Sequence, residues 1–198
     1  MPTRISLAAL LAAGLLLIAA CDDGGQHPGT PTSENTMANQ DQYAELMRRP
    51  SIEEMITRYD ALREQLRSDL TQQLGVASWT KQEGSASRTE CVREYPLVRP
   101  GDAEKRHLDT WFSPTPIAPA DWEKAKGIVS QAAGAQGFTK TKLVIDRPDD
   151  LQLDLADSFG AELSFGSTKN TIIALTTGCH MAAEVKKQAA SSSTPATK

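Results

Sequence analysis

The sequence predicts an α+β fold, in which an antiparallel sheet of about four to six strands is covered on one face by two helices. Two observations support this prediction. The last third of the chain holds four short apolar runs separated by turn residues, which is typical of an antiparallel meander. Two segments upstream, 52–74 and 119–136, repeat apolar residues at helical spacing.

The clearest element is a helix over residues 52–74. Ser51 is a favourable N-cap residue and Glu54 stands three positions later, so together they predict a capping box. Gly75 is placed to end the helix. Because the face opposite the apolar stripe is charged, we expect the stripe to pack against the sheet of its own domain. The stripe consists of Ile52, Met55, Ile56, Tyr59, Leu62, Leu66, Leu70 and Leu74.

The middle of the chain is expected to alternate between extended runs and a second helix. Short strands are predicted over 76–79 and 89–92, and a longer one over 108–112. Pro119 is suited to the first turn of a helix, and Gly137 is placed to end it. This second helix carries one apolar face, so it is the second cover for the sheet.

The four runs of the last third are the predicted meander. They span 139–145, 151–155, 161–165 and 171–176, and the second of them alternates strictly between leucine and polar residues. Such alternation indicates a strand with one buried face and one solvated face. The turn residues between the runs are few, so consecutive strands are expected to pair.

The N-terminus has the three-part organisation of a secretory signal. Arg4 precedes an apolar run over 5–18, and two small residues precede Cys21. As a helix the run would span only ~21 Å, against roughly 30 Å for a hydrocarbon core, so cleavage is favoured over a permanent span. Residues 17–21 resemble the lipobox of bacterial lipoproteins, in which the cysteine thiol receives a diacylglyceryl group. We therefore predict lipidation of Cys21; the alternative is an ordinary secretory signal followed by a cysteine.

Composition divides the chain into four parts. Residues 1–20 are the predicted signal peptide, and 21–43 form a lipidated flexible tether rich in Gly, Pro, Ser, Thr and Asn. Residues 44–186 suit a single domain, and 187–198 are predicted to be a disordered tail. The expected location is the extracytoplasmic face of the cell membrane, with the membrane as a partner through the anchor at Cys21.

The cysteines predict one disulfide. With Cys21 assigned to lipid, Cys91 and Cys179 remain in an oxidising compartment and are expected to pair. The alternative is two buried free thiols. No metal site is expected, because the histidines form no ligand-spaced cluster with these cysteines; they are His27, His107 and His180.

The net charge argues against nucleic acid as a partner. The 198 residues include 21 basic and 25 acidic side chains, a net charge of −4. Removal of Arg4 with the signal peptide leaves 20 basic and 25 acidic side chains, hence −5. A mildly acidic chain has no electrostatic attraction for nucleic acid or for anionic lipid head groups.

Several features of the predicted domain resemble a known family. They are the long first helix, Trp79, Cys91, the helix entry over 117–122 and the closing segment 177–179. Through them residues 45–183 resemble the LppA-like lipoproteins of mycobacteria and related actinobacteria. The resemblance implies a membrane-anchored location and a similar architecture. None of its motifs is catalytic, so it implies no active site.

The sequence lacks the motifs of common catalytic sites. There is no Gly-x-Ser-x-Gly elbow, Cys-x-x-Cys pair, phosphate-binding loop, dinucleotide fingerprint or His-Glu zinc signature. An acidic group near the end of the chain is interpreted as a solvated strand and its turns, not as a metal site. Its members are Asp146, Asp149, Asp150, Asp154 and Asp157. We expect no cofactor and no catalytic residue.

Two classes of function remain. The first is a non-enzymatic module that binds a lipid, a glycolipid, a cell-wall polymer or another envelope protein. Three tryptophans are candidates for its binding surface, although burial in the core is the favoured interpretation: Trp79, Trp111 and Trp122. The second class is an enzyme whose residues meet only in three dimensions. A deep pocket lined by His107 or His180 together with carboxylates would favour the enzyme, and a filled core would favour the binding module.

Overall fold

The computed structural model of the chain describes residues 33–192; the predicted signal peptide and Cys21 lie outside them. In chain order the elements are α1 (Ser33–Arg48), α2 (Ile52–Leu74), β1 (Thr80–Lys81), β2 (Ser87–Glu90), β3 (Ala103–Ser113), the short 3-10 helix η1 (Pro119–Asp121), α3 (Trp122–Gly134), β4 (Lys140–Arg147), β5 (Asp150–Ala156), β6 (Glu162–Ser167), β7 (Thr171–Thr176), β8 (His180–Met181) and α4 (Ala183–Ser192).

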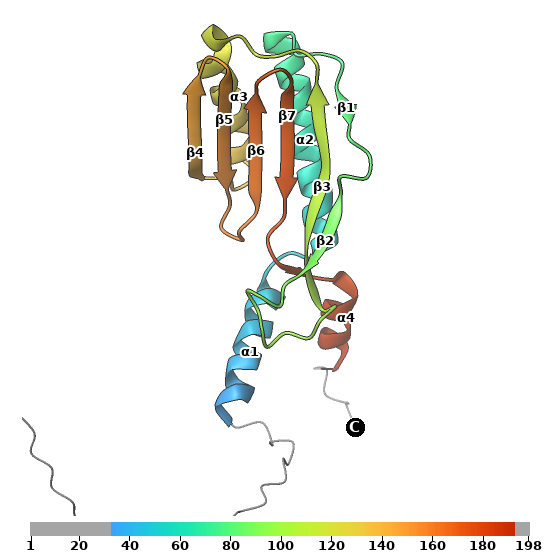
Figure 1. Cartoon of the computed structure of the whole chain (residues 1–198). Coiled ribbons are helices and arrows are strands. Elements are labelled where there is room, and N and C mark those ends of the chain that lie inside the picture. The colour runs from blue at the N-terminus through green and yellow to red at the C-terminus, as the bar shows by residue number, and fades with distance from the viewer. Residues whose placement is uncertain (1–32, 193–198) are drawn as a thin grey trace, which may run out of the picture. The chain divides into compact units, whose positions relative to one another are not determined.

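The strands form one antiparallel sheet, as predicted. The main path runs β1-β3-β7-β6-β5-β4, and β2 and β8 also pair with β3. Strands β4 to β7 are consecutive neighbours, which is the predicted meander. Helices α2 and α3 lie on one face of the sheet, behind the strands in Figure 1. Within residues 33–192 the sheet has eight strands, more than predicted, because two-residue strands such as β1 and β8 carry no readable periodicity.

Helix α2 begins and ends where its sequence predicts. The Ser51 hydroxyl accepts the backbone N–H of Glu54 at 3.2 Å, and the Glu54 carboxylate accepts the N–H of Ser51 at 2.6 Å. The capping box is therefore confirmed. Gly75 follows the helix with φ of 68°, a left-handed conformation that glycine adopts without strain. Its N–H donates to the carbonyls of Leu70 and Thr71, which closes the helix.

The main core lies between these two helices and the sheet. The apolar stripe of α2 packs against α3 and the inward side chains of β5, β6 and β7, and Trp122 stacks on Phe165 with ring centroids 5.3 Å apart. Trp122 is therefore a core residue, as favoured. Buried members include Met55, Tyr59, Leu62, Leu66, Leu70, Ala125, Val129, Leu153, Leu163, Phe165, Ile173 and Leu175.

A second, smaller apolar cluster lies where α1 and α4 meet the end of the sheet (Figure 1). Its buried members are Leu46, Cys91, Tyr95, Val98, Ala103, Cys179 and Met181, and Tyr43, Met47 and Val185 pack against it. This cluster is built from segments far apart in the chain. Its stability consequently depends on what holds those segments together.

The two terminal helices differ from the composition-based expectation. Helix α1 covers residues 33–43, which were assigned to the tether, and α4 covers 187–192, which were assigned to the tail. The reason is tertiary: Leu46 is fully buried, and the Tyr43 hydroxyl donates to the Asp102 carboxylate at 2.6 Å. None of the helices in the described residues is long and apolar enough to cross a membrane.

The short strand predicted over 76–79 is wrong. Ser78 adopts a positive φ of 57°, which interrupts an extended path, and the strand β1 begins two residues later at Thr80. Trp79 instead packs against the core, and its indole N–H donates to the Thr71 hydroxyl at 3.1 Å. Trp79 is thus a packing residue on the flank of α2.

Candidate functional site

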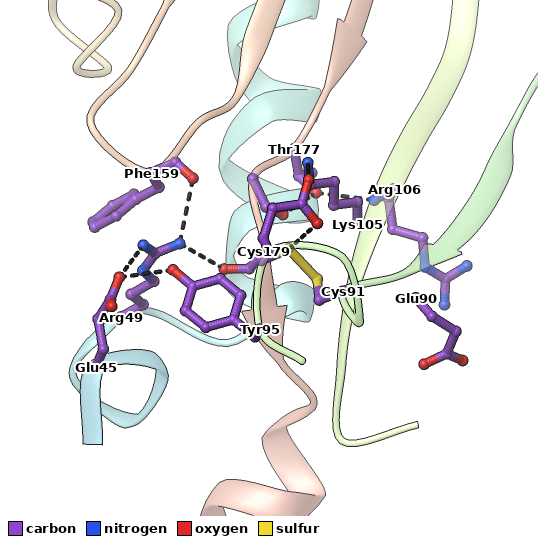
Figure 2. The surroundings of a disulfide bond; sticks show 12 residues. Glu45, Arg49, Glu90, Cys91, Tyr95, Lys105, Arg106, Phe159, Thr177 and Cys179 are labelled. Carbon is purple, nitrogen blue, oxygen red and sulfur yellow. Dashed lines mark hydrogen bonds and ion pairs between the residues drawn. A yellow bond between two sulfur atoms is a disulfide. The ribbon is translucent and has the colours of Figure 1, made fainter. Parts of the chain in front are cut away.

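Cys91 and Cys179 form the predicted disulfide, with Cα atoms 5.9 Å apart (Figure 2). Cys91 follows β2 and Cys179 precedes β8, and both are 2% exposed within the smaller cluster. The bond therefore joins the end of β2 to the start of β8, the two short strands that pair with β3. It is a structural bond, and its sulfur atoms are not presented to solvent.

The surroundings of the disulfide are a closed network of polar contacts, which Figure 2 shows. The Arg49 guanidinium donates to the carbonyls of Cys179 at 3.0 Å and Phe159 at 3.3 Å, and it pairs with Glu45 at 2.5 Å. The Tyr95 hydroxyl donates to the same Glu45 oxygen at 2.7 Å. This hydrogen bond is the main cause that lowers the pKa of Glu45, while burial raises the pKa of Tyr95 to about 12. Arg49 thus joins Glu45 of α1 to the chain around Cys179.

His180 lies beside this network and is fully buried. Its Nδ1 lies 3.0 Å from the Pro50 carbonyl, and its ring meets Phe159 edge-on at a centroid distance of 5.4 Å. Burial lowers the pKa of His180 below its ordinary value, so the neutral ring is favoured. A buried, neutral ring packed against an aromatic side chain is a core residue. His180 therefore does not line a pocket of the kind that would favour an enzyme.

A groove of about 470 Å³ lies on the other flank of the sheet, between α2 and strands β1, β2 and β3. This volume falls within the roughly 300 to 1,000 Å³ typical of ligand pockets. The groove is our candidate functional site. Its lining consists of Ile56, Asp60, Arg63, Glu64, Arg67, Lys81, Ala86, Ser87, Arg106, His107, Leu108, Asp109 and Trp111.

One wall of the groove is a face of α2 and the floor is β3. The helix contributes residues spaced by three or four positions, including Arg63 and Arg67, which lie one above the other on a helix surface. Strand β3 carries a register irregularity between Leu108, which is buried in the core, and Trp111, which packs against it. The irregular stretch includes Asp109, whose carbonyl accepts a hydrogen bond from Arg63. The bulge thereby fixes an arginine of the helix against the strand.

The groove has an unusual arrangement of charge, because its arginines are deeper than their acidic partners. Arg63 pairs with Asp60, and their side chains are 7% and 52% exposed. Arg67 pairs with Glu64, with exposures of 16% and 73%. The guanidinium groups therefore lie in the walls and floor, and the carboxylates lie at the solvent-facing rim.

Other contacts hold the arginines in place. The Arg67 guanidinium lies 3.6 Å from the centroid of the Trp111 ring, a cation–π arrangement, and its Nε donates to the Arg63 carbonyl at 3.3 Å. The Nε of Arg63 is buried and has no hydrogen-bond partner. Trp111 is therefore a surface of the groove, unlike Trp122 in the core.

The two ends of the groove carry further ionic contacts. At one end Lys81 lies 3.6 Å from the Asp109 carboxylate, which also accepts the backbone N–H of Ala86 at 3.0 Å. At the other end Arg106 pairs at 2.5 Å with Glu104, a buried carboxylate that Arg88 also contacts. Both ends are thereby fixed to the sheet edge.

His107 lines the groove by position, but its imidazole belongs to the opposite face of the sheet. It is paired in register with Thr176, and its Nδ1 lies 2.9 Å from the Thr176 hydroxyl. Its neighbour Leu108 is buried in the core beneath α2, and successive side chains of a strand point to opposite faces. The ring is therefore directed away from Arg63 and Arg67.

The acidic group near the end of the chain does not gather into a metal site. No group of three or more potential metal ligands occurs in residues 33–192. Asp146 receives the Trp122 indole N–H and the Lys126 ammonium, and Asp154 accepts the Ser164 hydroxyl at 2.6 Å. The expectation of a solvated group is wrong for Asp157, which is 5% exposed. It is buried because it accepts the Tyr59 hydroxyl and the N–H groups of Phe159 and Ala161.

The two arginines of the groove carry only a weak signal in the sequence. Arg63 and Arg67 each follow a residue of the apolar stripe by one position, Leu62 and Leu66, so they stand at the boundary of the buried face. Their spacing of four positions was the available signal. What it does not reveal is that Trp111, far along the chain, lies beneath Arg67.

The antiparallel sheet, its helical cover and its disulfide define a class, the small disulfide-bridged α+β domain suited to an oxidising compartment. The sequence profile of the LppA family, described as a lipoprotein confined to pathogenic Mycobacterium, matches residues 25–183. The chain belongs to the LppA family. Membership of a lipoprotein family implies a lipid anchor and a location in the cell envelope. No curated protein matches the chain.

Two solved structures are similar to the fold. The crystal structure of LppA from Mycobacterium tuberculosis superposes with a TM-score of 0.59 at 14% identity, covering 78% of this chain and 94% of that one. A DUF4853 family protein from Actinomyces odontolyticus has a TM-score of 0.48 at 18% identity, with coverage of 69% and 72%. At such identities the likeness to LppA shows a shared fold and assigns no ligand.

Proposed function

We propose that the protein is a lipid-anchored binding module on the extracytoplasmic face of the cell membrane, held at Cys21 and without catalytic activity. Its membership of a lipoprotein family supports the anchor, and residues 17–21 supply the lipobox. Two acyl chains on one cysteine are sufficient for stable attachment without a membrane-spanning helix. The folded body then presents the groove to ligands or partners outside the cytoplasm.

The observation that carries the binding interpretation is the pairing of charges in the groove. Asp60, Glu64 and Asp109 each have a cationic partner, so each carboxylate has a salt-bridge role. General acid–base or nucleophilic catalysis requires a base within hydrogen-bond reach of a nucleophile. The imidazole of His107, the natural base, is bonded to Thr176 on the other face of the sheet. A recessed set of paired ionic groups suits recognition better than turnover.

The alternative is an envelope enzyme, and one observation favours it. His107 is a lining residue of the groove together with carboxylates, although its imidazole is directed to Thr176. One variant distinguishes the two proposals. His107→Ala should leave ligand retention intact if the groove is a binding site, whereas an enzyme that uses this imidazole would lose turnover and accumulate bound substrate.

The anchor is tested by labelling with radioactive palmitate in the native host. We expect wild-type protein to take up the label and Cys21→Ala to lose it and accumulate uncleaved or in the soluble fraction. Cys91→Ala is the matched control, and it should keep the label because its thiol is not the acceptor. An unlabelled wild-type protein would refute the anchor.

The binding role is tested by native mass spectrometry of the mature protein purified from its own host. A copurifying molecule that is released unchanged on denaturation is the expected result. A bound species that is converted to product over successive turnovers would instead establish the enzyme.

A further inference from the structure

We infer that the groove binds an oxyanion, a phosphate or carboxylate group, which pairs with Arg63 and Arg67 in place of the rim carboxylates Asp60 and Glu64. This inference rests on the proposed binding function and names its ligand chemistry. The ligand is either a small anion or an anionic group of a larger envelope lipid. Both share the same oxygen atoms at the arginines.

The arginines of the groove lie deeper than the carboxylates that pair with them. A charge removed from water is costly unless it is paired, and a solvent-exposed partner is screened. Here the arginines are recessed while Asp60 and Glu64 are 52% and 73% exposed. A largely exposed carboxylate is screened by water, so it is a weak partner for a recessed guanidinium. An anion seated in the groove would take the place of each rim carboxylate, so the arginines stay paired while Asp60 and Glu64 turn into solvent.

Both guanidinium groups are held in fixed positions. The Arg67 guanidinium is stacked 3.6 Å from the Trp111 ring centroid, and Arg63 is held by the carbonyl of Asp109 at the bulge. A fixed guanidinium loses less freedom on binding than a mobile one. These contacts engage the planes and single N–H groups of the arginines. Each guanidinium also donates to its rim carboxylate, Arg63 to Asp60 and Arg67 to Glu64.

Arg63 carries an unpaired hydrogen-bond donor. The Nε of Arg63 is buried without a hydrogen-bond partner, in a residue that is 6% exposed. Buried donors without partners are uncommon in folded proteins. Arg63 lines the groove, so an anion seated against this guanidinium would lie beside the unpaired group. A second oxygen of a bound carboxylate or phosphate would supply the acceptor that Arg63 Nε lacks.

The residue types that line the groove favour an oxyanion. Arginine forks bind carboxylate and phosphate oxygens in pairs, which a single lysine does not do. Lys81 and Arg106 add positive charge at the two ends, and Ile56 and Leu108 add apolar surface. The lining therefore fits an anionic head with a short apolar or carbon-rich continuation. It does not fit a cation, because the exposed carboxylates lie outside the recessed positive layer.

The test uses the three indole N–H signals of the full mature protein, in nonionic detergent and labelled with nitrogen-15 at tryptophan. Inorganic phosphate, added against chloride of equal ionic strength, should shift the Trp111 signal saturably. Trp122 is the internal control, since its indole N–H is bonded to Asp146 and its ring is buried in the core.

Succinate, added in the same way, tests whether the groove binds a carboxylate. Short-chain phosphatidic acid, below its micellar concentration, distinguishes a lipid-borne phosphate from a free one by a tighter dissociation constant.

Three variants of α2 should change the affinity for the probe in different ways. Arg67→Gln should weaken binding of the effective probe by at least tenfold, because the stacked guanidinium is lost. Glu64→Gln should tighten it several-fold, because the competing rim carboxylate is removed; a merely structural role for this residue predicts no gain. Arg58→Gln is the matched control on the same helix, and it should change nothing because Arg58 pairs with Gln136 away from the groove.

The inference is overturned if none of the three probes shifts Trp111 saturably at millimolar concentration, or if Glu64→Gln binds no better than wild type. An equal loss in Arg58→Gln and Arg67→Gln also overturns it, because the effect would then be general electrostatics. These failures are distinct from failure of the proposed function. A copurifying neutral ligand would refute the anion chemistry and leave the binding module standing, whereas turnover of any probe would refute the module.

Discussion

Removal of the disulfide is the perturbation whose magnitude follows most directly from the structure. The bond joins residues 88 positions apart, and the loop it closes contains β3, α3 and strands β4 to β7. In the chain-entropy treatment a loop of this length restricts the unfolded chain by about 4 to 5 kcal/mol, and measured bridges typically give about 2 to 4. We expect the double variant Cys91→Ala with Cys179→Ala to lose about 2 to 4 kcal/mol of unfolding free energy.

The loss is large against the total. A folded domain is typically stable by about 5 to 15 kcal/mol, so the variant would retain only part of its stability. For a chain of this size a loss of 1 kcal/mol lowers the melting temperature by about 2 to 4 °C, so we expect a fall of about 4 to 16 °C. Urea unfolding followed by circular dichroism measures the free energy, and the wild type in reductant should match the double variant.

The structure also predicts where the effect is felt first. Helices α1 and α4 pack on the cluster that contains both cysteines, while α2 packs on the main core. Amide hydrogen exchange should therefore accelerate in α1 and α4 before it does in α2. A stability change below about 1 kcal/mol, or exchange that accelerates equally in α2, would refute this reasoning.

Three further predictions rest on single contacts. Gly178→Ala should destabilise the fold by about 1 to 3 kcal/mol in urea unfolding, because a Cβ there would lie 2.0 Å from the Phe159 carbonyl oxygen; a neutral result would show that the two segments separate freely. Tyr59→Phe should cost about 1 to 3 kcal/mol in the same assay, because the Tyr59 hydroxyl donates to the buried Asp157 at 2.6 Å. Burial lowers the pKa of His180 in the folded state, so the unfolded chain binds the proton more tightly and stability should fall as pH drops below about 6.5. His180→Gln should flatten that fall, and an unchanged pH profile of unfolding would contradict the assignment.

The local elements that sequence could predict are those with strong, contiguous patterns. Ser51 and Glu54 predict the capping box because both partners lie within one turn. The leucines of β5 predict its inward face because strand alternation needs only one segment. Helix α1 was missed because its stability depends on Tyr43 and Leu46 meeting residues far along the chain.

The groove could not be predicted in the same way. The sequence shows only that the face of α2 opposite the apolar stripe is charged, whereas in the structure Arg63 is 6% exposed because β3 and the β1–β2 segment lie against that flank. The stacking of Arg67 on Trp111 joins a helix to a strand with no local signal in either. His107 differs from the arginines. Its position in β3 places it in the groove lining, but the strand register directs its ring to Thr176.

The sequence by itself determined the helix over residues 52–74, the second helix, the consecutive strands of the meander and the pairing of Cys91 with Cys179, because helix capping, alternation and cysteine count are properties of short or discrete patterns. Only the tertiary structure decided which charges are recessed and which are exposed. Burial of a side chain depends on neighbours brought together by folding, and Asp60 and Arg63 differ in exposure although they lie one turn apart on the same helix.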